Sequence, residues 1–149
     1  MVSQIRTVKC DVVVVGSGNA GFSAAVSAVQ AKAGKALLID KCPEEWAGGN
    51  SFFTAGAFRT THDGLQDVLP IVSNVDAETA KLVDLQPYTN EDFLNDMSRI
   101  TQGRYDRELG RVLVEESNEV IKWLAKNGLE FQLSFNRQVS QKPPSCYPS

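Results

Sequence analysis

The stretch that decides the fold is Cys10-Asp-Val-Val-Val-Val-Gly-Ser-Gly-Asn-Ala-Gly21. Its consecutive valines are β-branched, which favours a strand buried on both faces, as in a parallel sheet covered by helices. The glycines behind them form the pattern GxGxxG and lead into a small-residue segment, residues 22–33, that suits a helix. A second apolar run, residues 36–39, ends in Asp40. This order of strand, glycine turn, helix, strand and acid predicts an α/β fold that holds a dinucleotide.

The residues of this unit have separate physical tasks. Gly16 allows the tight turn, and Gly18 lets the backbone approach a pyrophosphate. Gly21 lets the helix pack closely on the strands, while the helix dipole and the first amides favour a negative ligand. Gly34 is placed to end the helix. Asp40 stands near the spacing at which a carboxylate accepts hydrogen bonds from a ribose diol, and it disfavours NADP. The alternative is a glycine-rich turn in an unrelated α/β protein.

Composition excludes several classes of function. The 149 residues suffice for one domain with a core, and 42% hydrophobic and 22% charged residues are ordinary for a globular protein. A net charge of −3 gives no reason to expect nucleic acid or an anionic membrane as partner. No apolar run approaches the length of a membrane span, and residues 1–9 lack the apolar region of a signal peptide.

The cysteines and the histidine carry no recognisable site. Cys10, Cys42 and Cys146 are odd in number and form no CxxC pair, so we expect no disulfide framework and no metal site. Reduced thiols indicate a cytoplasmic protein. His62 is the only histidine, and it lacks a partner for a metal site or a triad, so we interpret it as structural or exposed.

A second glycine element follows the acid. It is Gly48-Gly-Asn-Ser51, and the small residues Thr54, Ala55 and Gly56 come shortly after it. Adjacent glycines permit positive φ, so the turn can bind an anion or lie against a flat ring system. The alternative is a plain loop.

The second half of the chain is predicted to be largely helical. Residues 60–88 carry turns and prolines, and we expect a surface loop with one short element there. Thr89 is typical of an N-cap, with a helix through about Ile100. The last residues are rich in proline and show no periodicity, which predicts an irregular tail over residues 138–149.

A longer helix is predicted before Asn127 and Gly128, which would close it. Its apolar face would consist of residues spaced by three or four, with Trp123 beside them in the core. Glu115, Glu116, Glu119 and Lys122 would face solvent. The residues expected on the apolar face are Leu109, Val112, Leu113, Ser117, Val120, Ile121 and Leu124.

Three elements in order carry a family resemblance: the strand and glycine turn of residues 11–21, Leu37-Leu-Ile-Asp-Lys41, and Gly48-Gly-Asn-Ser51. In these elements the chain resembles the fumarate reductase/succinate dehydrogenase flavoprotein family. The following Thr54-Ala-Gly-Ala-Phe-Arg59 looks most like the tricarballylate dehydrogenase branch. The resemblance covers residues 9 to about 136.

The resemblance implies that the chain binds FAD. Asp40 and the Lys41 backbone would hold the adenosine side, and the pyrophosphate would lie on the glycine turn. Covalently flavinylated members carry His where Asn50 stands, so the resemblance implies non-covalent FAD. The pyrophosphate residues would be Gly16, Gly18, Asn19, Ala20 and Gly21, and those along the flavin half Gly49, Asn50, Ser51, Ala55 and Gly56.

The resemblance also implies a reaction on a small-molecule substrate. Family members oxidise C–C single bonds beside carboxylates or carbonyls, or reduce the corresponding alkenes, with hydride passing through flavin N5. An Arg-based proton path lies in a later capping domain that this sequence does not reach, so no catalytic residue carries over. Arg59 and Arg137 are interpreted as solvated surface residues.

We therefore expect a partial Rossmann-like FAD-binding domain, a β-α-β start plus helices, over residues 1–137 and truncated before the capping domain. Sequence returning from near the C-terminus completes this domain in the family, so the valine strand would expose an apolar edge here. Two alternatives stay open. The chain could be a non-catalytic truncated remnant, or an NAD-binding Rossmann domain, which would leave residues 48–51 without a role.

Overall fold

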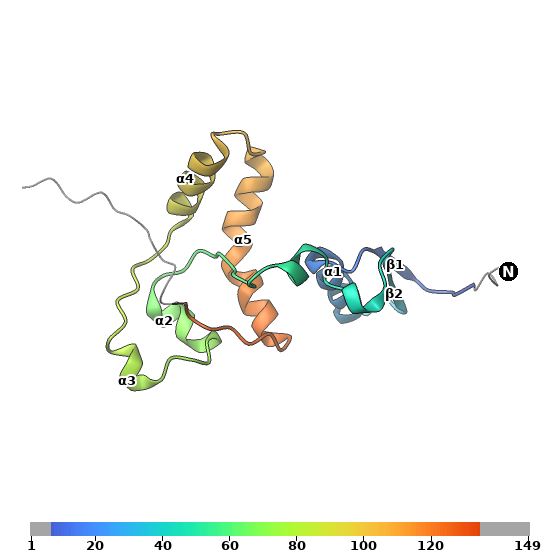
Figure 1. The fold of residues 1–149 in the computed structure, drawn as a ribbon, viewed down its shortest axis with the longest axis horizontal. Coiled ribbons are helices and arrows are strands. Elements are labelled where there is room, and N and C mark those ends of the chain that lie inside the picture. Colours follow the sequence, from blue (N-terminus) through green and yellow to red (C-terminus); the bar gives the residue numbers. More distant parts are fainter. Residues whose placement is uncertain (1–6, 135–149) are drawn as a thin grey trace, which may run out of the picture. The chain divides into compact units, whose positions relative to one another are not determined.

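The computed structural model describes residues 7–134, and the chain divides into two compact units, residues 1–58 and 59–149 (Figure 1). The predicted tail of residues 138–149 and Arg137 lie outside the described residues. Each unit has its own secondary structure and is described by itself.

The first unit is built on a β-α-β start. Strand β1 (Val12–Val15) is followed by helix α1 (Asn19–Gln30) and strand β2 (Ala36–Ile39). The strands pair in parallel, with Val12 opposite Ala36 and Val15 opposite Ile39, and α1 packs on both (Figure 1). This confirms the predicted α/β fold and places the carboxyl ends of both strands at one edge.

The burial of β1 differs from the prediction. Val12 and Val14 are half-buried, whereas Val13 is 53% and Val15 79% exposed. The alternation follows from the two-residue period of a strand, since α1 covers one face and nothing in residues 7–134 forms a further strand of this sheet. The valine run is therefore half-covered and not buried on both faces.

The end of α1 also differs from the prediction. The helix stops at Gln30, and the left-handed residue after it is Lys32, with φ 58°, instead of Gly34. Gly34 has φ 84° in the turn before β2, where a Cβ would lie 2.4 Å from the Asp11 carboxylate. That carboxylate accepts a hydrogen bond from the Lys35 N–H at 2.8 Å. Gly34 thus makes room for a side chain that holds the turn and does not terminate the helix.

The second unit is helical. Its segment 60–88 contains α2 (Leu65–Val68), the 3-10 turn η3 (Leu69–Ile71) and α3 (Ala77–Ala80), so the expectation of a loop with one short element is wrong. Polar side chains of α5 (Arg107–Lys126) fasten the start of this segment. The Asn118 amide donates to the Thr61 carbonyl at 2.7 Å and to the Asp67 carboxylate at 2.8 Å. These long-range bonds leave no local signature, whereas α3 has a local signal that the prediction missed, the Asp76 carboxylate that accepts from the Thr79 N–H at 2.7 Å.

Helix α4 (Asn90–Thr101) confirms the helix predicted after Thr89. The Thr89 hydroxyl accepts a hydrogen bond from the Asp92 N–H at 3.2 Å, and the Asp92 carboxylate accepts from the Thr89 N–H at 3.0 Å. This reciprocal capping box satisfies backbone donors that the first turn would otherwise leave unpaired. Helices α4 and α5 then pack side by side (Figure 1).

Helix α5 ends at Lys126 before Asn127 and Gly128, as predicted, but its buried face is displaced from the expected one. Leu109, Val112, Leu113 and Val120 are exposed, while Lys122 is only 31% exposed and pairs with Asp67 at 2.8 Å. The Tyr105 ring packs directly on Gly110, and a Cβ on Gly110 would lie 2.6 Å from the ring. The side of α5 that carries Gly110 therefore faces inward. Trp123 is half-buried. The residues that α5 buries are Gly110, Val114, Ile121 and Leu124.

None of the helices within residues 7–134 is long and apolar enough to cross a membrane.

Replacing Thr89 by Ala should lower the free energy of unfolding of the helical unit by about 0.5–2 kcal/mol, because an N-cap acceptor is lost. Urea denaturation followed by fluorescence of Trp123, in the adjoining α5, measures this. Thr89→Ser keeps the hydroxyl and is the matched control. Equal stability of the Ala and Ser variants would contradict the capping role.

Candidate cofactor site

The candidate site lies at the carboxyl ends of β1 and β2. The Gly16 N–H donates to the Ile39 carbonyl at 2.7 Å, so the glycine turn after β1 begins beside the end of β2. Asp40 follows directly on that strand. The predicted association of the glycine turn with the terminal acid is therefore present in the fold.

The Asp40 carboxylate is held by donors of the chain itself. One oxygen, Oδ2, accepts from the backbone N–H and, at 2.7 Å, from the hydroxyl of Ser17. The other, Oδ1, accepts from the N–H and the thiol of Cys42, both at 2.9 Å. Hydrogen bonds from Cys42 and then Ser17 hold the pKa of Asp40 well below its usual range. Asp40 is thus an ionised, exposed acceptor at the edge of the sheet.

Ser17 connects three segments, and no role was predicted for it from the sequence. Its side chain is 2% exposed, and besides its two bonds to Asp40 its carbonyl accepts from the Gly48 N–H at 2.8 Å. Ser17 occupies a variable position of GxGxxG, so the motif itself does not predict its role. The available sequence signal is its hydroxyl, a short hydrogen-bond donor in a turn that precedes a strand ending in an acid.

The second glycine element lies against the first. Gly18 and Gly48 form a parallel bridge, and a Cβ on Gly49 would stand 3.0 Å from the Gly18 Cα. Both glycines have positive φ, 125° at Gly48 and 57° at Gly49, as predicted. The element continues as a 3-10 helix, η2 (Gly49–Phe53). It is therefore paired with the glycine turn and is not a plain loop.

Of the remaining predicted residues, all but Ala55 and Gly56 belong to the segments that meet at this junction. Asn19 and Ala20 form the first turn of α1, and Lys41 is exposed next to Asp40. Asn50 and Ser51 are exposed within η2, while Ala55 and Gly56 follow it in an exposed segment. Gly56 donates its N–H to the Thr54 hydroxyl at 3.2 Å. The geometry gathers the glycine turn, Asp40 and the glycine pair, and it leaves Ala55 and Gly56 without a described contact to them.

Comparisons with known proteins identify the family of this chain. A family model described as an FAD binding domain covers residues 11–143. The chain belongs to this FAD-binding family. It is 34% identical over 120 residues to a fumarate reductase (cytochrome) of Shewanella frigidimarina, covering 80% of this chain and 18% of the relative. It is 30% identical over 117 residues to the probable fumarate reductase Ifc3 of Shewanella frigidimarina strain NCIMB 400, covering 78% of this chain and 17% of the relative.

These relatives place this FAD-binding domain in the fumarate reductase/succinate dehydrogenase type, a family of FAD-dependent oxidoreductases. The chain spans less than a fifth of the length of the curated relatives it matches.

The start of α1 in this FAD-binding domain fits a pyrophosphate. Its N-cap is Gly18, no side chain caps the helix, and its first turn contains no acid, so its leading N–H groups stay open to an anion. Gly18 presents no side chain to block that approach, and a Cβ there would have only the Gly49 Cα, at 3.9 Å, within 4 Å. The chemistry of the site, open amides beside an ionised acceptor, is what a dinucleotide requires.

Two other candidate groups, His62 and Arg59, belong to the second unit. His62 is buried, accepts a hydrogen bond from the Gly64 N–H at Nδ1, and has its pKa lowered by burial, so it is a neutral structural residue. Arg59 is exposed but not free, since it donates to Asp96 at 2.7 Å and to the Tyr88 hydroxyl at 2.9 Å. The expectation of a surface Arg is confirmed, since its side chain is 55% exposed, and the pairing with Asp96 was not predicted. Residues 7–134 contain no group of His, Cys, Asp and Glu suited to a metal ion.

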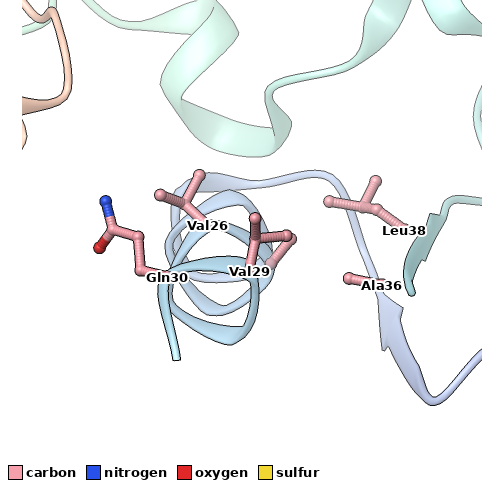
Figure 2. A pocket seen from close by; sticks show the side chains of 6 residues that line it. Val26, Val29, Gln30, Ala36 and Leu38 are labelled. Carbon is pink, nitrogen blue, oxygen red and sulfur yellow. The ribbon is translucent and has the colours of Figure 1, made fainter. Parts of the chain in front are cut away.

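An apolar groove of about 400 Å³ lies elsewhere in the first unit, between the second half of α1 and β2 (Figure 2). Val26 and Val29 line it from the helix, and Ala36 and Leu38 from the strand. The α1 residues that line the groove lie one to three helical turns after the start of the helix at Asn19. The groove is therefore separate from the cofactor site.

Gly21→Ala should destabilise the first unit by about 1–3 kcal/mol, because the new Cβ would meet the Gly16 carbonyl oxygen, which is backbone and cannot swing away. Hydrogen exchange of the α1 amides measures the loss. Gly18→Ala is the matched control, since its Cβ has space and its φ of −81° suits alanine. Equal protection of α1 in both variants would contradict the close packing at Gly21.

Proposed function

We propose that this chain is the FAD-binding portion of a flavin-dependent oxidoreductase and that it binds FAD without a covalent link. The observation that carries the proposal is the junction of three segments at one sheet edge. There Ser17 joins the glycine turn to Asp40, and its carbonyl joins both to Gly48. An NAD-binding domain would need the first two segments only.

We assign the cofactor's parts to this junction as follows. The open amides of α1 and the glycine turn would bind the pyrophosphate through Gly16, Gly18, Asn19, Ala20 and Gly21. The Asp40 carboxylate and the Lys41 backbone would bind the adenosine side. The flavin half would lie along Gly49, Asn50, Ser51, Ala55 and Gly56. Asn50 carries an amide and no nucleophilic nitrogen, which supports non-covalent binding.

Bound FAD would supply a two-electron carrier that accepts or donates hydride. We propose that the enzyme uses it on a small molecule, to oxidise a C–C bond beside a carboxylate or carbonyl or to reduce the corresponding alkene. The names of the relatives support this class of reaction, and residues 54–59 support the tricarballylate dehydrogenase branch. No described residue is assigned a catalytic role.

Cys10 and Cys42 are free thiols, in keeping with the predicted cytoplasmic location.

The chain purified with added FAD should retain the cofactor, seen as flavin absorbance that is released by acid precipitation. Titration should show FAD binding more tightly than NADH, because only FAD uses the glycine pair at residues 48–49. Gly18→Ala should weaken FAD binding about tenfold or more, since a methyl group would stand where the backbone meets the pyrophosphate. A folded chain that does not bind FAD would contradict the proposal. Tighter binding of NADH than of FAD would favour the NAD-binding alternative.

Asp40→Asn should weaken FAD binding about tenfold, because a charged acceptor for the ribose diol becomes a neutral amide. In the parent chain, binding should stay level across about pH 5 to 8, as the depressed pKa keeps the carboxylate ionised there. It should fall only in stronger acid, when the carboxylate takes up its proton. Titrations at several pH values measure this, and a midpoint near pH 6 would contradict it.

A further inference from the structure

The Asp40 carboxylate has no acceptor position left for a ligand. A carboxylate offers about four lone-pair positions, and the chain fills them with the N–H and hydroxyl of Ser17 on Oδ2 and the N–H and thiol of Cys42 on Oδ1. Yet Asp40 itself is exposed, so a nucleotide can reach it. A ribose hydroxyl that binds the carboxylate must therefore displace a donor of the chain.

The four donors are not equally easy to displace. The two N–H groups belong to the backbone, and the Ser17 hydroxyl belongs to a residue that is 2% exposed and also bonded through its carbonyl. The Cys42 thiol is half-buried at the surface, and a thiol is a weak donor. The sulfur also lies 3.7 Å from the Trp46 carbonyl oxygen and interacts with the Ser17 side chain.

The thiol is in the form that donates. The hydrogen bond to Asp40 raises the pKa of Cys42, so the sulfur keeps its proton at neutral pH. The thiol therefore donates to Oδ1, with 2.9 Å between Sγ and Oδ1, in the position that a ribose hydroxyl would take.

We propose that the Cys42 thiol competes with the ribose diol for Asp40 and thereby sets the affinity of the proposed cofactor site. This inference rests on the proposed function, because it assumes that Asp40 binds the ribose. Without nucleotide, hydrogen bonds from the thiol and from Ser17 hold the carboxylate in place and occupy its acceptor positions. When nucleotide binds, the thiol leaves Oδ1 and one ribose hydroxyl replaces it, with no covalent change.

The test compares two nucleotides that differ only in the diol. ADP carries the pyrophosphate, adenine and ribose diol of the FAD half in question, and 2′,3′-dideoxy-ADP lacks both hydroxyls. Calorimetry on the full chain should show Cys42→Ala binding ADP about two- to fivefold more tightly than the parent chain, the range expected for one weak hydrogen bond. Binding of 2′,3′-dideoxy-ADP should be the same in both, because that ligand does not displace the thiol.

Two variants control the comparison. Cys10→Ala removes the other free thiol of the described chain and should leave both affinities unchanged. Cys42→Ser restores a donor in the same place, and it should remove the gain or make ADP binding weaker than in the parent chain.

The outcomes separate this inference from the proposed function. If FAD binds the parent chain but Cys42→Ala binds ADP no better, the competition is refuted and the cofactor site stands. An equal gain for both nucleotides would also refute it, since it would reflect a general change in the loop. If neither FAD nor ADP binds the parent chain, the proposed function and this inference fall together.

Discussion

The rest of the cofactor site depends on the pair formed by Ser17 and Asp40. Two hydrogen bonds from one residue of the glycine turn reach a single carboxylate oxygen at the end of the neighbouring strand. Because the Ser17 carbonyl also receives the Gly48 N–H, the same residue places the second glycine element. Ser17 thereby joins three segments that are separated in sequence. Because the pKa of Asp40 is depressed, its carboxylate stays ionised at physiological pH.

Around this point the site is made mainly of backbone. Gly48 and Gly49 both have positive φ, and a Cβ on Gly49 would stand 3.0 Å from the Gly18 Cα, so the second glycine element favours glycine at both positions. The first N–H groups of α1 have no side-chain cap, and the first turn of the helix contains no acid that would repel an anionic ligand. A surface of open donors beside an ionised acceptor is suited to an anionic, diol-bearing ligand, whereas residues 7–134 offer no group of side chains suited to a metal ion.

Prediction from the sequence succeeded for three features with a local signal. The parallel β-α-β start, the Thr89 cap and the end of α5 before Gly128 follow from properties of neighbouring residues, and the structure contains all three. It succeeded only in part for the buried face of α5, where Ile121 and Leu124 are buried as predicted. There an apolar stripe ran through Leu109 and Leu113, but the contact of Tyr105 with Gly110 turns a different face inward. Periodicity reports that a helix has an apolar face, and packing partners select which residues are covered.

The sequence by itself determined the order of elements, the positions that must be glycine and the acid that ends β2, because steric limits and hydrogen-bonding capacity act within a few residues. Only the tertiary structure decided that Ser17 is the connecting residue and that one face of the valine strand stays exposed. These facts depend on which donors and surfaces meet across 20 or more residues of chain, as Ser17 and Asp40 do at a separation of 23. Local propensity carries no information about such meetings.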